Sequence, residues 1–165
     1  MLYQIFIRSF PYFFIFFFIF FENVPIYFFD EKVIKPFISF SILYCWICQD
    51  YSRFRPFWLL IFGVFCDLLQ SEIVGLTSLF FLLIFHIQRK SDNVLLSPDF
   101  KESWIKFGII LTIYIFIYYL LNYIFSSISF STANVFICLV LTFLFFPIFF
   151  LIIDKLSNKF RKFDE

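Results

Sequence analysis

Long apolar runs are the feature that most restricts how this chain folds. The first extends from about Tyr3 to Phe21, and similar runs recur along all 165 residues, separated by short charged clusters. Hydrophobic residues make up 62% of the chain and charged residues 15%, whereas about a quarter of the residues in a soluble domain are charged. The pattern predicts an all-α, polytopic membrane protein with a single transmembrane domain. The first run lacks a small-residue cleavage site and is expected to be a retained span.

Helix length determines how many times the chain is expected to cross. About 20 helical residues cross a hydrocarbon core of about 30 Å. The stretch from Phe54 to Ile87 would be about 51 Å long as one helix, so we expect a hairpin that turns at Gln70–Glu72. The predicted transmembrane helices are residues 3–21, 33–48, 54–69, 73–87, 104–125 and 135–153, followed by a short basic cytoplasmic tail at 154–165.

The positions of the basic residues support the hairpin. Arg53 and Arg55 precede it, and Arg89 and Lys90 follow it. Lysine and arginine collect in cytoplasmic loops, so both flanks are expected on the same side of the membrane. With six spans, 11 of the 13 basic residues fall on the inner side, which predicts cytoplasmic N- and C-termini. The basic tail is also suited to anionic membrane lipid, while the net charge of +1 gives no indication of a nucleic-acid partner.

Asp67 is a carboxylate inside the third predicted span, one turn from the expected hairpin. An ionised, unpaired carboxylate in hydrocarbon costs about 2.5–3.5 kcal/mol on insertion scales, so a partner is expected. Gly63 and Asp67 share a helical face, where a neighbouring helix beginning at Gly75, Thr77 and Ser78 could approach closely. Three roles remain open at this point: a polar residue near a helix end, a packing or folding contact, and a proton or ion relay.

The segment "GVFCDLLQSEIVGL" resembles the MreD family of bacterial rod shape-determining membrane proteins, through the spacing of Gly63, Asp67 and Gly75. Pro36 followed by the Tyr44 and Trp46 region supports the resemblance. So does "FPIFFLIIDKLSNKF", in which Pro147 interrupts the last span before the basic tail. The length and the six predicted spans also fit this family.

The resemblance implies a non-enzymatic scaffold of the elongation complex in the bacterial inner (plasma) membrane. Such a scaffold supports peptidoglycan synthesis and cell shape by binding MreC and, indirectly, MreB and the elongation synthases. We expect the single span of MreC to occupy a groove rimmed by small and aromatic residues. The structural or partner-binding candidates are Gly63, Asp67, Gly75, Pro36, Trp46 and Pro147. Pro147 suggests a kink that serves either as a hinge or for packing.

Other chemistry receives little support from the residue pattern. Cys45 and Cys48 form a C-x-x-C, but the predicted topology places the pair near the reducing cytoplasmic face. His86 is the only histidine and lies at the predicted inner interface, where we expect it to reach water rather than bind metal. We therefore predict no catalytic residue, no cofactor and no metal.

The alternative function is the substrate-binding membrane subunit of a small-solute, vitamin-type transporter. Such a site needs several polar groups that converge on one pocket. The polar residues within the predicted spans are scattered: Ser39, Ser41, Asp67, Thr112, Asn122 and Thr142. Most are expected to bond to their own helix backbone or to a neighbouring helix.

Overall fold

The computed structural model describes residues 2–23, 36–70, 74–91, 99–126 and 132–164. Within these ranges the protein is helical and contains no strand, which confirms the predicted all-α class. The elements are α1 (Leu2–Asn23), α2 (Ile38–Asp50), the short 3₁₀ helix η1 (Tyr51–Arg53), α3 (Pro56–Gln70), α4 (Leu76–Ser91), α5 (Phe100–Ser126) and α6 (Thr132–Asp164).

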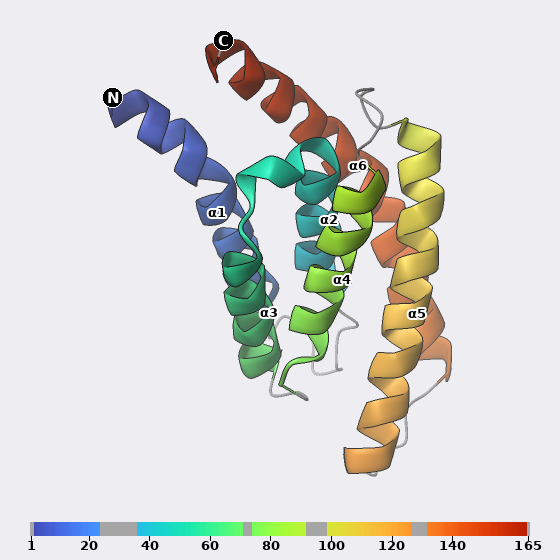
Figure 1. Cartoon of the computed structure of the whole chain (residues 1–165). Coiled ribbons are helices and arrows are strands. Elements are labelled where there is room, and N and C mark those ends of the chain that lie inside the picture. Colours follow the sequence, from blue (N-terminus) through green and yellow to red (C-terminus); the bar gives the residue numbers. More distant parts are fainter. Residues whose placement is uncertain (1, 24–35, 71–73, 92–98, 127–131, 165) are drawn as a thin grey trace.

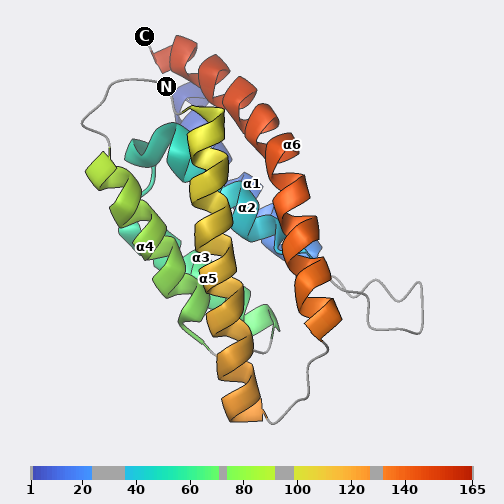
Figure 2. The same cartoon turned by 90° about the vertical axis from the view of Figure 1, so that its right-hand side faces the viewer.

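Successive helices run in alternate directions along one axis (Figures 1 and 2). α1, α3 and α5 descend in the view of Figure 1, and α2, α4 and α6 ascend. The start of α1 and the end of α6 therefore lie at the same, upper end of the molecule, together with η1. The first residues of α2 and α4 lie at the opposite, lower end.

α2 is the central helix, and α1, α4 and α6 pack around it. Every residue from Ser39 to Gln49 is buried. The helix has 13 residues, which gives a length of about 20 Å. A helix that is apolar around its whole circumference must be shielded from water, either by other elements or by lipid. The chain meets this requirement with an aromatic core that includes Phe40, Trp46 and Phe81.

Within the described ranges, α5 and α6 are the two helices that are long and apolar enough, by length and composition, to cross a membrane. The qualifying segments are Phe100–Phe125 and Val135–Phe160, each of 26 residues. Shorter apolar segments occur at Ser9–Glu22 and Pro56–Leu69. Large apolar side chains cover much of the outer surface, including Phe13, which is 69% exposed.

The helix boundaries differ from the predicted spans most clearly at the start of α2 and at the end of α6. α2 begins at Ile38, although the apolar run predicted a start near residue 33; the residues before 36 lie outside the described ranges. The predicted turn at Gln70–Glu72 lies partly outside them as well. α6 passes through Pro147 without interruption and continues to Asp164, so most of the predicted basic tail is helical.

Candidate functional site

Asp67 joins α3 to the first turn of α4. Its side chain is 1% exposed. Its Oδ2 accepts a hydrogen bond from the Gly75 amide at 2.7 Å, and its Oδ1 accepts one from the Thr77 amide at 3.3 Å. The first amides of a helix have no partner within the helix, and they attract negative charge. The buried carboxylate therefore acts as an N-terminal cap supplied by a neighbouring helix, and the partner predicted at Gly75 and Thr77 is confirmed.

Gly63 lies where the backbones of α3 and α4 meet. A Cβ atom at this position would lie 2.3 Å from Ser78 Cα and 2.4 Å from Ser78 N. Ser78 Oγ in turn donates to the Leu60 carbonyl at 3.2 Å. Such backbone contact requires a residue without a side chain, and small residues serve the same purpose where membrane helices cross closely. The predicted close approach at Gly63 is confirmed.

The same geometry changes the prediction for the MreC groove. The Gly63 and Asp67 face is occupied by α4 of this chain, so it is not open to a second helix. Gly75 has a positive φ of 108° and directly precedes α4. This left-handed conformation favours glycine, which explains the residue without reference to a partner. Spacing along one helix identifies a contact face, but it does not distinguish an internal neighbour from an external one.

Glu22 forms a second cap of this kind, which the sequence analysis missed. It is 8% exposed, and its Oε2 accepts a hydrogen bond from the Ser39 amide in the first turn of α2 at 2.7 Å. The adjacent Phe37 amide donates to Thr142 Oγ1 of α6 at 3.1 Å. Phe37 is the N-cap residue of α2 and has no side chain able to cap it, so α1 and α6 supply the acceptors. The sequence contained one signal for this contact: the residue at the N-cap position of α2, Phe37, has no side chain that can accept a hydrogen bond.

Polar contacts connect these two caps at the lower end of the molecule. Ser39 Oγ lies 3.9 Å from Cys66 Sγ, which links α2 to α3 beside Asp67. Thr77 Oγ1 and Tyr114 Oη lie 3.0 Å apart and link α4 to α5. Each of the helices α1 to α6 thus takes part in the buried polar contacts at the end where α2 and α4 begin.

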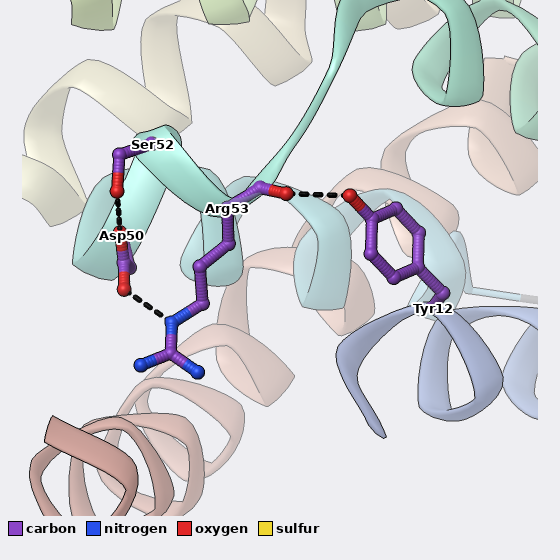
Figure 3. Close-up of polar contacts among 4 residues, drawn as sticks. All are labelled: Tyr12, Asp50, Ser52 and Arg53. Carbon is purple, nitrogen blue, oxygen red and sulfur yellow. Dashed lines mark hydrogen bonds and ion pairs between the residues drawn. The ribbon is translucent and has the colours of Figure 1, made fainter. Parts of the chain in front are cut away.

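At the upper end, η1 is held against α1 by a second group of contacts (Figure 3). The Tyr12 hydroxyl donates to the Arg53 carbonyl. Arg53 Nε forms an ion pair with Asp50, which also accepts a hydrogen bond from Ser52 Oγ at 2.6 Å. The Arg53 guanidinium carbon lies 6.0 Å from the centre of the Phe160 ring. These contacts give the turn between α2 and α3 a defined conformation.

Next to this turn, residues of α1, η1 and α3 line an open pocket of about 510 Å³. Its polar part is formed by Ser9, Ser52, Arg53 and Arg55. Its wall is aromatic and consists of Tyr12, Phe13, Phe16, Trp58 and Phe62. A smaller groove of about 190 Å³ lies between α4 and α5 and is lined mainly by isoleucines.

The remaining candidates lie apart from these sites. Pro36 precedes α2, and its carbonyl accepts a hydrogen bond from the Ile38 amide at 2.9 Å. Trp46 is buried in the core, and its indole nitrogen has no hydrogen-bond partner among the described residues. Pro147 is an interior residue of α6. The six candidates therefore do not form one site: three belong to the contact between α3 and α4, and three are separate.

Cys45 and Cys48 are buried free thiols within α2. Cys48 Sγ lies 3.9 Å from Gln88 Oε1. His86 is exposed near the end of α4. Among the described residues, no group of three or more histidine, cysteine, aspartate or glutamate side chains is arranged to hold a metal ion.

Most of the scattered polar residues bond to their own helices, as predicted. The side chains of four residues donate to the carbonyl four positions earlier, at 3.2, 2.7, 3.0 and 2.7 Å; they are Ser41, Thr112, Asn122 and Thr142. Ser39 and Asp67 contact other helices, and Thr142 also accepts the hydrogen bond from the Phe37 amide at the start of α2. These hydroxyl and amide groups form hydrogen bonds with the backbone of their own helices, and they do not converge on one pocket.

Comparison with family models, with curated proteins and with solved structures finds no match to this chain.

Proposed function

We propose that the chain is a six-span protein of the bacterial inner membrane with both termini in the cytoplasm. Large exposed apolar side chains on all sides support a lipid environment. The alternating helices bring the start of α1 and the end of α6 to one end. Basic residues collect at that same end, on η1 and at the ends of α4, α5 and α6: Arg53, Arg89, Lys90, Lys101, Lys155 and Lys159. The positive-inside rule assigns this end to the cytoplasm.

Short helices are compatible with this arrangement. α2 is only about 20 Å long, but protein surrounds it, so its length need not match the bilayer. Non-helical backbone at membrane depth is tolerated where it is buried in protein. α3 and α4 have 15 and 16 residues, and a local thinning of the bilayer or interfacial side chains accommodate such lengths at modest cost.

Within this membrane the protein acts as a non-enzymatic scaffold of the rod-shape (elongation) complex. The residues of the chain resemble those of the MreD family, and from this resemblance we infer both the complex and the direct partner, MreC. The scaffold role is supported by the hydrogen bonds that the buried polar side chains form. The caps at Asp67 and Glu22 bind helix to helix within the protein, and the other polar side chains of the spans bond mainly to their own backbones.

The groove between α4 and α5 is the surface that we assign to the single span of MreC. It is lined by Tyr44, Ile84, Ile87, Gln88, Lys106, Ile109 and Ile110. The backbone of α5 lies close mainly to α6, while aromatic side chains such as Phe107 and Tyr114 fill its contacts with α2 and α4. Helices associate in lipid by close packing rather than by the hydrophobic effect. A groove between two separated helices offers that packing to a third.

Site-specific photo-crosslinking in cells tests this assignment. A photoreactive residue at Ile109 or Ile87 is expected to capture MreC, whereas one at Leu151, an exposed residue of α6 outside the groove, is not. Equal capture from Leu151 would contradict the groove. Normal cell shape after depletion, together with no recovery of MreC from any position, would contradict the scaffold function itself.

A thermal-shift screen separates the scaffold from the transporter alternative. A scaffold is stabilised by its protein partner and is unaffected by small solutes. A saturable rise in unfolding temperature with a vitamin-type solute would instead favour the substrate-binding subunit of a transporter.

A further inference from the structure

The pocket between α1 and α3 combines positive charge with an aromatic wall. Arg55 lines the pocket, is exposed, and has no carboxylate partner among the described residues. None of the described residues that line the pocket is acidic. The charge of Arg53 is partly balanced by Asp50, whereas none of the described carboxylates forms an ion pair with Arg55. The pocket therefore has a net attraction for an anion.

The positive part of the pocket is held in position before any ligand binds. Tyr12 fixes the Arg53 carbonyl from α1, and Asp50 fixes the Arg53 side chain (Figure 3). Arg55 follows this turn by two residues and directly precedes α3. A binding site whose backbone is ordered in advance avoids part of the entropy cost of binding.

The aromatic wall continues onto the outer surface of the protein. Phe13 is 69% exposed and Trp58 is 43% exposed, and both line the pocket. A small hydrophilic anion would gain nothing from these rings. An amphiphile would place its charged group at Arg55 and its apolar chains along Phe13 and Phe16. Tyrosine and tryptophan also favour the level of the lipid headgroups.

We infer that this pocket binds the headgroup of an anionic phospholipid from the cytoplasmic leaflet. The inference rests on the membrane placement proposed above and is independent of the identity of the protein partner. The volume of about 510 Å³ lies within the range of small-molecule sites and suits a phosphate-containing headgroup, with the acyl chains outside. Basic pockets between membrane helices on the cytoplasmic side bind such headgroups, and arginine pairs well with phosphate.

Tryptophan quenching by brominated lipid tests the inference directly. The protein is placed in phosphatidylcholine nanodiscs with increasing fractions of brominated phosphatidylglycerol. Trp58 in the pocket should be quenched, and the signal should disappear in Trp58→Phe. Arg55→Gln is expected to raise the lipid fraction at half-quenching by about tenfold, because a charge-assisted contact is lost. The matched control Arg89→Gln removes an exposed arginine outside the pocket and should leave this fraction unchanged.

Three outcomes would overturn the inference. Equal quenching by brominated phosphatidylcholine and phosphatidylglycerol would show ordinary lipid contact without headgroup selection. Relief of quenching by millimolar inorganic phosphate would assign the site to a soluble anion. Equal effects of Arg55→Gln and Arg89→Gln would show that only total charge matters.

Further measurements keep these results distinct from effects on folding and from the proposed function. Arg55→Lys keeps the charge and should retain the preference for phosphatidylglycerol even if Arg55→Gln does not fold; loss of the preference in folded Arg55→Lys counts against a charge-based site. Crosslinking of MreC from Ile109 should be unaffected by Arg55→Gln. Failure of the lipid site would therefore leave the scaffold function standing. Failure of the protein to enter nanodiscs would instead contradict the membrane placement.

Discussion

The contact between α3 and α4 and the contact between α5 and α6 use glycine in different ways. At Gly63 the opposing atoms belong to the backbone of Ser78. At Gly108 of α5 the nearest atom is Cε2 of the Phe143 ring, 2.9 Å from the position of an added Cβ. A ring can rotate or shift, whereas a helix backbone moves only together with its neighbours. The first contact is therefore rigid, and the second is adaptable.

The largest expected effect is that of Gly63→Ala. Its methyl group would overlap the backbone of Ser78 and separate α3 from α4, which also pulls Asp67 away from the amides that it caps. We expect a loss of about 3 kcal/mol in the free energy of unfolding, at the upper end of the usual range for overpacking. Thermal unfolding of the detergent-solubilised protein measures it.

Gly108→Ala is the matched control for Gly63→Ala. The Phe143 ring must shift slightly, while alanine favours the helix by up to about 1 kcal/mol over glycine. The net change is expected to stay within about 1 kcal/mol. Equal destabilisation by the two alanine substitutions would contradict the distinction between a backbone contact and a ring contact.

The next effect in size is that of Asp67→Leu, which removes the acceptor for two amides. Unsatisfied buried donors cost about 1–3 kcal/mol each, and we expect about 2 kcal/mol in total because the end of α4 can rearrange. Fluorescence-detected size-exclusion chromatography should show a lower folded yield. Asp67→Asn keeps one acceptor oxygen and should recover part of the yield; an unchanged profile for Asp67→Leu would contradict the capping role.

Glu22→Ala is expected to have a smaller effect, of about 1 kcal/mol, typical of the loss of an N-terminal cap. The Ser39 amide loses its acceptor, but the neighbouring Phe37 amide keeps its bond to Thr142. Hydrogen exchange should increase in the first turn of α2 and remain unchanged in the first turn of α4. Equal exchange in both turns would show that the two caps are not independent.

Thr112→Val should have the smallest effect. The Thr112 hydroxyl bonds to the Gly108 carbonyl of its own helix, and the side chain is exposed. The expected change is below about 0.5 kcal/mol, as for most surface substitutions. A large loss of stability would reveal that this face of α5 has a function other than contact with lipid.

Periodicity and charge predicted the helical class and the partners of Asp67. The apolar runs are long enough to indicate helices, and a buried carboxylate beside two glycines indicates a close neighbour. Glu22 was missed because its partner, Ser39, lies 17 residues away, beyond a segment with no helical period. The pocket was missed for a similar reason: Tyr12 and Arg53 are 41 positions apart, and hydropathy does not report which helices become neighbours.

The boundaries of α2 and α6 were the least predictable from hydropathy. Val33 and Ile34 are separated from Ile38 by Lys35, Pro36 and Phe37, so hydropathy alone does not locate the start of α2. The first amides of this helix have acceptors that α1 and α6 supply. At the other end of the chain, charged residues mark where the membrane should end, but they do not stop a helix. α6 continues past Lys155 and Lys159 because both residues favour helix formation.

The length of α6 has a mechanical consequence. Its 33 residues extend about 50 Å, against a hydrocarbon thickness of about 30 Å. In the proposed orientation its last turns project into the cytosol as a stiff rod that is continuous with the core. In that orientation, a cytoplasmic protein bound to these last turns would be attached to the same helix that packs against α2 inside the protein.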